Sequence, residues 1–153
     1  MCGIYFFAIL VCLIYVYNFE VQFIIMVSEI TAGVEVAVQT MYQAAHSVPE
    51  EHAYVFAYKI VISNHNDFTV QLLSRRWIIT NAIGEVEVVE GDGVVGRQPV
   101  LYRGDSHEYV SGSNLATPFG MMEGAYFFQN KTTREIFEVK IPLFKLEAPF
   151  ALN

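Results

Sequence analysis

The hydrophobic pattern after residue 33 repeats every second position. Residues 34–39 alternate valine with glutamate, alanine or glutamine, and residues 54–63 alternate large apolar side chains with valine, alanine or lysine. This alternation is typical of half-buried β-strands, in which successive side chains point to opposite faces. Five further strands are predicted, over residues 69–80, 85–89, 107–110, 125–129 and 136–141. Pro142 is expected to end the last strand because proline cannot donate to a ladder.

Turn signals separate these strands. Asparagine and aspartate at 64–67 hydrogen-bond their own backbone and tolerate left-handed conformations, and residues 91–99 are rich in glycine. Other connections are predicted at 43–52, 81–84, 103–105, 117–120 and 130–132. After Met26 there is no long run with a helical period. About seven short strands with frequent turns predict an all-β fold, a two-sheet β-sandwich.

The first 25 residues differ in character from residues 26–153, which we expect to form the domain. The apolar run at 4–17 is shorter than the roughly 20 residues of a membrane-spanning helix. A secretory signal requires a basic segment before its apolar run, and no lysine or arginine precedes Lys59. The preferred interpretation is that Met26 is the true start and that residues 1–25 are translated upstream DNA. A membrane anchor and a signal peptide remain alternatives.

Composition narrows the function classes. Only 16% of residues are charged and the net charge is −7; an acidic chain repels phosphate backbones, so no nucleic-acid partner is expected. Cys2 and Cys12 both precede residue 26, which leaves the rest of the chain without a disulfide or thiolate metal site. We therefore expect a cytoplasmic protein, with a membrane role only if residues 1–25 are retained.

One glycine motif suggests ligand binding. The spacing of Gly91, Gly93 and Gly96 formally matches the dinucleotide fingerprint, but Pro99 and strand-like residues follow, so no helix N-terminus is available for a pyrophosphate. Two interpretations remain, a tight turn and an anion-binding nest of backbone amides. Arg97 lies within this loop, and further positive charge is available from Arg75, Arg76 and Arg103.

Other chemistry is weakly indicated. None of His46, His52, His65 and His107 has a ligand-like spacing to another histidine or cysteine. Glu50, Glu51 and Asp67 lie near three of them in sequence, which leaves a weak hypothesis of direct Mg²⁺ or Co²⁺ binding. No serine is paired by spacing with a base. We expect no enzyme and no cofactor.

Several blocks of sequence resemble the ApaG family. The string at 91–99 is similar to the family's signature loop, and other matching blocks occur in order at 54–58, 70–77, 109–118, 122–126 and 141–153. The likeness covers about residues 29–153. The chain departs from the family pattern at Arg76, where histidine is usual, at Asp92 and Arg97, where glutamate is usual, and at Ser113, where cysteine is frequent.

The resemblance implies an immunoglobulin-like or fibronectin-III-like sandwich and an association with cobalt and magnesium efflux. It also implies protein partners, since related domains occur in eukaryotic F-box proteins. The main hypothesis is a non-enzymatic binding or regulatory module. Binding of a phosphate or pyrophosphate ligand by the glycine loop is the alternative, with Gly91, Gly93, Gly96 and Arg97 as binding residues and Arg75 and Arg76 as counter-charges. Exposed sheet edges leave a homodimer open.

Overall fold

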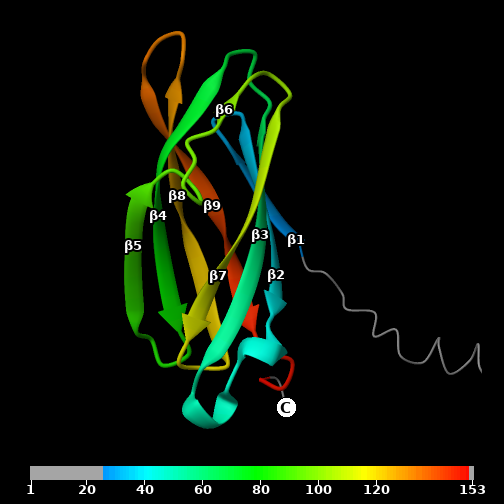
Figure 1. Ribbon diagram of the computed structural model, residues 1–153. Coiled ribbons are helices and arrows are strands. Elements are labelled where there is room, and N and C mark those ends of the chain that lie inside the picture. Colours follow the sequence, from blue (N-terminus) through cyan, green and yellow to red (C-terminus); the bar gives the residue numbers. More distant parts are fainter. Residues whose placement is uncertain (1–25, 152–153) are drawn as a thin grey trace, which may run out of the picture.

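The computed structural model describes residues 26–151, and these form an elongated β-sandwich (Figure 1). Two short 3₁₀ turns, η1 and η2, precede β3. The elements of the described part are β1 Met26–Thr31, β2 Val34–Tyr42, η1 Ala44–His46, η2 Pro49–Glu51, β3 Tyr54–Asn64, β4 Val70–Asn81, β5 Val86–Asp92, β6 Val100–Leu101, β7 Ser106–Leu115, β8 Phe119–Asn130 and β9 Ile136–Glu147. The predicted two-sheet sandwich is confirmed.

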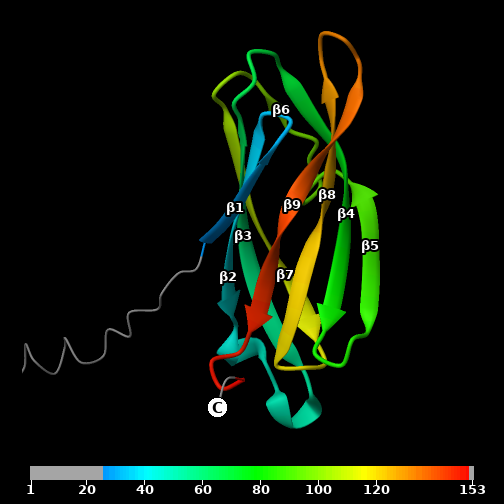
Figure 2. The same cartoon turned by 180° about the vertical axis from the view of Figure 1, so that it is seen from behind.

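Two antiparallel sheets make the two layers. One has the order β1-β2-β3-β7, and the other has the order β5-β4-β8-β9 with β6 paired to one end of β4. Views from opposite sides place β9 beside β1 and β2 at one flank and β5 alone at the other (Figures 1 and 2). Along that second flank β5 and β7 are both terminal strands.

The core follows directly from the alternation in sequence. Every second residue of β3, from Tyr54 to Asn64, is buried, and the residues between them are half-buried. Trp77 of β4 is 3% exposed, and its ring packs against Tyr58 of the opposite sheet and against Tyr126 and Phe144 of its own sheet. Aromatic rings in tilted and edge-on arrangements therefore fill the space between the layers.

The expectation that Pro142 ends a strand is wrong. Pro142 is buried inside β9, which continues to Glu147. The register between β8 and β9 shifts there, with Gly124 opposite Ile141 and Met122 opposite Phe144. Proline is compatible with a β-bulge because the bulged residue makes no regular ladder bond.

Other strand boundaries also differ from the prediction. β1 lacks a strong alternation signal and was not predicted, although it pairs fully with β2. β5 extends through Gly91 and Asp92, which were predicted as loop, and β7, β8 and β9 are each longer than expected. The predictions for residues 1–25 lie outside the described residues. Within residues 26–151 no helix has the length and apolar character needed to cross a membrane.

Candidate functional site

The glycine loop is a small hairpin. The amide of Val94 donates to the carbonyl of Arg97 at 2.7 Å, and the amide of Arg97 donates back to Val94 at 3.0 Å. The two residues between them have φ of 46° at Val95 and 72° at Gly96. Two central residues with positive φ define a type I′ turn, which suits antiparallel strands. We call residues 94–97 the hairpin tip.

The hairpin tip is anchored at both ends. The amide of Gly93 donates to the carbonyl of Leu73 at 2.8 Å, and Nε2 of Gln98 donates to the same oxygen at 2.7 Å. Val94 is only 1% exposed and belongs to the core. The ordered backbone between β5 and β6 therefore presents the tip in one orientation.

Packing excludes a side chain at Gly93 and leaves little room for one at Gly91. A Cβ on Gly93 would lie 2.1 Å from the carbonyl oxygen of Arg97, closer than any real contact. A Cβ on Gly91 would lie 3.1 Å from Nη1 of Arg75. Gly96 stands in open space and is required by its positive φ. The glycines thus build the turn and admit an arginine beside it.

The two neighbouring arginines of β4 have different roles because successive side chains on a strand point to opposite faces. Arg75 shares the inner face with Trp77, and its Nη1 donates to the carbonyls of Asp92 at 3.0 Å and Gly93 at 2.8 Å. Arg76 is exposed on the outer face, with its Nε 3.4 Å from Oε1 of Glu90. The structure brings Arg75 to the loop and places Arg76 on the other side of the sheet.

The hairpin tip exposes an apolar and a cationic side chain side by side. Val95 is 63% exposed, and Arg97 is also exposed. Partial burial, and then the charge of Arg97, lower the pKa of His107 on β7. The amides of Gly93, Val94 and Arg97 are already used by backbone carbonyls; any anion here would be held by side chains and the remaining amides.

Two hydrogen-bonded phenols, the buried Tyr126 and the partly buried Tyr109, join the two sheets. The hydroxyls of Tyr109 on β7 and Tyr126 on β8 form a hydrogen bond across the two sheets. Burial raises the pKa of both phenols well above the ordinary value, with Arg75 acting weakly in the opposite direction. Both remain neutral at physiological pH, and their hydrogen bond joins the two sheets.

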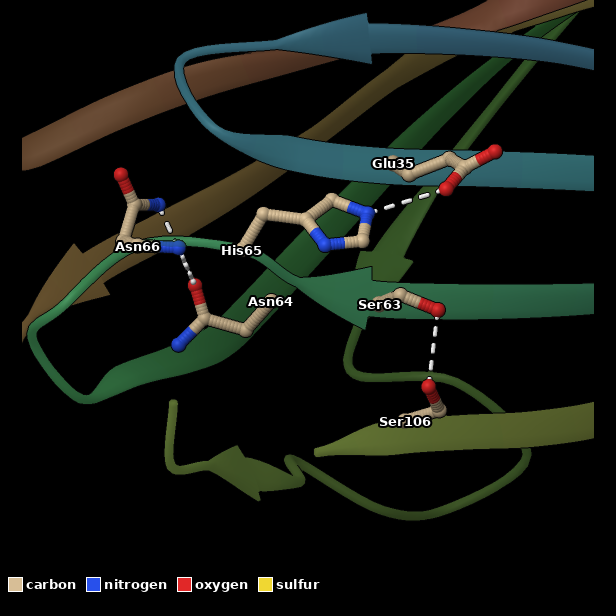
Figure 3. Close-up of polar contacts among 6 residues, drawn as sticks. All are labelled: Glu35, Ser63, Asn64, His65, Asn66 and Ser106. Atoms are coloured by element: carbon tan, nitrogen blue, oxygen red, sulfur yellow. Dashed lines mark hydrogen bonds and ion pairs between the residues drawn. The ribbon is translucent and has the colours of Figure 1, made fainter. Parts of the chain in front are cut away.

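A second polar cluster, at the far ends of β2 and β3, is structural. Asn64 is fully buried; its Nδ2 donates to the carbonyls of Phe68 and Leu101, and its Oδ1 accepts from the amide of Asn66. Around it, His65 meets Glu35 at 2.9 Å and Ser63 meets Ser106 at 2.8 Å (Figure 3). These side chains satisfy one another and tie the 64–67 turn to neighbouring strands.

The histidines and carboxylates do not gather into a metal centre in the described part of the chain, where no three of them are placed to share an ion. Sequence reasoning missed Val95, whose strained backbone appears only in the folded hairpin. It named both His107 and Arg97 but did not connect them, and the charge of Arg97 acts on His107 only in the folded chain. The sequence feature that could have predicted this hairpin is the string Val94-Val95-Gly96-Arg97. It is difficult to identify because valine occupies the position where a type I′ turn usually has asparagine.

Comparison with known proteins gives consistent matches. The ApaG domain matches residues 44–130. Protein ApaG of Brucella abortus strain S19 is 47% identical over 124 residues, which cover 81% of this chain and 95% of that protein. Protein ApaG of Paramagnetospirillum magneticum is 45% identical with the same coverage. The crystal structure of a Bordetella pertussis protein described as ApaA superposes with a TM-score of 0.74 at 41% identity, covering 76% of this chain and 94% of that one.

Proposed function

The chain belongs to the ApaG family, and from that premise we propose that it is a cytoplasmic, non-enzymatic binding and regulatory module associated with cobalt and magnesium efflux. Its recognition surface is the hairpin tip. In this proposal the domain holds the tip in position to bind a protein partner that the efflux response requires.

One observation carries the proposal. Val95 is a β-branched residue at φ 46°, and it is 63% exposed. Left-handed backbone costs a non-glycine residue roughly 1–2 kcal/mol. Asparagine is the usual residue at such a position and would form the same turn with less strain. Strain that folding does not need is a mark of function.

The neighbouring charge completes the surface. Arg97 follows the apolar tip directly and lies on an otherwise acidic protein of net charge −7. An exposed guanidinium can form bidentate bonds to a partner's carboxylate. Arginine is among the residues enriched at the energetic centres of protein interfaces, and exposed Val95 would add apolar contact area beside it.

The test uses a bacterial strain that lacks its own copy of the gene and measures growth on cobalt. We expect Val95→Asn and Arg97→Ala, both folded, to fail to restore wild-type growth. Arg103→Ala and Val110→Asn, which change an exposed arginine and an exposed valine elsewhere, should restore it. Full restoration by both tip variants would remove the hairpin tip from consideration.

A second candidate is binding of inorganic phosphate or pyrophosphate between Arg97 and His107. The observation that favours it is the exposed guanidinium of Arg97 on the glycine loop, whose charge contributes to the lowered pKa of His107. A bound anion would offset that charge and stabilise the imidazolium, so the pKa of His107 should rise on addition of pyrophosphate. An NMR titration of His107 with and without pyrophosphate decides this, and parallel titrations with Mg²⁺ and Co²⁺ test direct cation binding.

A further inference from the structure

The terminal strand β5 offers an unpaired edge. Among the described strands it pairs only with β4, and the register from Thr80–Val86 to Ser74–Asp92 is continuous. Both views show the strand alone at the flank of the molecule (Figures 1 and 2). A straight edge with regular pairing behind it can accept another strand.

The hydrogen bonds at the two ends of β5 show which groups point outward. The amide of Asn81 donates to Glu85 at one end, and the amide of Gly93 donates to Leu73 at the other. Hydrogen-bonded pairs alternate along an antiparallel ladder, so Glu87, Val89 and Gly91 bond to β4. The amides and carbonyls of Val86, Val88 and Glu90 therefore face away from the sheet.

A groove lies beside this edge, where the end of β7 approaches β4 and β5. It has a volume of about 240 Å³. Ile79 and Leu115, which are 9% and 7% exposed, form an apolar floor. The exposed side chains of Glu85 and Glu87 stand at its rim. An apolar floor with carboxylates at the rim suits the aliphatic stem and cationic head of lysine or arginine.

The negative charge along β5 indicates which kind of strand could pair with its free edge. Residues 85–92 include four acidic residues, Glu85, Glu87, Glu90 and Asp92, and no basic one. Pairing of two β5 strands would bring these carboxylates of both copies together, which disfavours a second copy. We propose that β5 binds an extended basic segment of a partner protein as an added strand, with one lysine or arginine side chain in the groove. This surface is distinct from the hairpin tip.

The probe is a synthetic peptide, as long as the seven residues of β5, in which lysine alternates with threonine. The full chain is labelled with ¹⁵N, and amide hydrogen exchange is measured with and without the peptide. We expect the amides of Val86, Val88 and Glu90 to become protected while those of Glu87 and Val89, already bonded to β4, change little. Peptide binding that leaves the three outward amides unprotected would overturn the proposal.

Two variants test the edge and the groove separately. Val88→Pro removes an outward amide but no bond to β4, and proline is tolerated on edge strands; it should abolish binding. Glu87→Lys keeps the backbone and should weaken binding about tenfold, as loss of a charge-assisted contact does. If Val88→Pro fails to fold, Glu87→Lys still tests the proposal.

Controls distinguish the proposal from general attraction and from the hairpin tip. Glu138→Lys makes the same charge change on exposed β9, at the opposite end of the sheet order, and should leave affinity within about twofold. Arg97→Ala should bind the peptide normally even if the tip is the recognition surface. The assignment would be refuted if Glu138→Lys weakened binding as much as Glu87→Lys, or if a glutamate–threonine peptide bound equally tightly. It would also be refuted if the lysine–threonine peptide did not bind at millimolar concentration, or if the protein formed a homodimer that Val88→Pro dissociates.

Discussion

At the scale of single residues, Trp77 packs against aromatic rings of both sheets. Its ring is 5.6 Å from that of Tyr58 and 5.9 Å from that of Phe144, measured between centroids. Because its neighbours belong to both sheets, they can close the space that its removal would leave only in part. Its contribution is therefore one of packing, and its chemistry is not used.

We expect Trp77→Ala to lower the free energy of unfolding by about 3–5 kcal/mol, the usual cost of deleting a buried aromatic ring. Urea denaturation followed by circular dichroism measures this. A loss below roughly 1 kcal/mol would be typical of an exposed position and would contradict the assignment.

At the scale of elements, the hairpin tip combines a rigid base with a strained turn. Gly93 and Val94 are buried, whereas Val95 and Gly96 are exposed. Arg75 bonds the carbonyls of Asp92 and Gly93 from below. The base therefore holds the turn at little cost to the rest of the fold, and substitutions at the turn should act locally.

Val95→Asn should raise the free energy of unfolding by about 0.5–1 kcal/mol, because asparagine adopts the left-handed region more readily than valine. Chemical denaturation at neutral pH measures the difference. Combined with lost function in the cobalt assay, it would show that valine is kept for recognition.

Val110→Asn is the matched control, since Val110 is 61% exposed in the regular strand β7. There the same change should leave stability unchanged or slightly lower, because asparagine is a poor strand former. If both variants shifted stability alike, the gain at residue 95 could not be attributed to its backbone conformation.

At the scale of the whole molecule, the Tyr109–Tyr126 bond joins the two sheets through groups that resist ionisation. Burial raises the folded-state pKa of both phenols above the unfolded value near 10. At higher pH the unfolded chain loses these protons before the folded one does. Linkage then requires stability to fall as pH rises above about 10.

We expect unfolding midpoints measured between pH 8 and about 11.5 to stay level up to about pH 10 and then decline. Tyr126→Phe should flatten the decline while lowering stability at pH 8, because Tyr109 then loses its partner. An alkaline decline of the same slope in Tyr126→Phe would show that other groups cause it.

The domain boundary gives a second prediction at this scale. The described core extends from Val34 to Ala148, and β1 begins at Met26. A chain that starts at Met26 should therefore keep its thermal midpoint and its cobalt phenotype. A midpoint lowered by more than about 5 °C, equivalent to roughly 1 kcal/mol in a domain of this size, would assign residues 1–25 a structural role.

The sequence by itself determined the strands of strong alternation, the two-layer sandwich and the ApaG family. The strands and the sandwich follow from local geometry, because side chains of a strand alternate between faces wherever the strand lies. The family follows from the resemblance of several sequence blocks to those of known members. Tertiary structure decided the rest. It paired the weakly patterned β1, accommodated Pro142 in a bulge, and separated Arg75 from Arg76. It also excluded a side chain at Gly93 by packing and strained the backbone of Val95. Each of these depends on atoms that are distant in sequence, so only the folded neighbourhood determines whether a side chain fits.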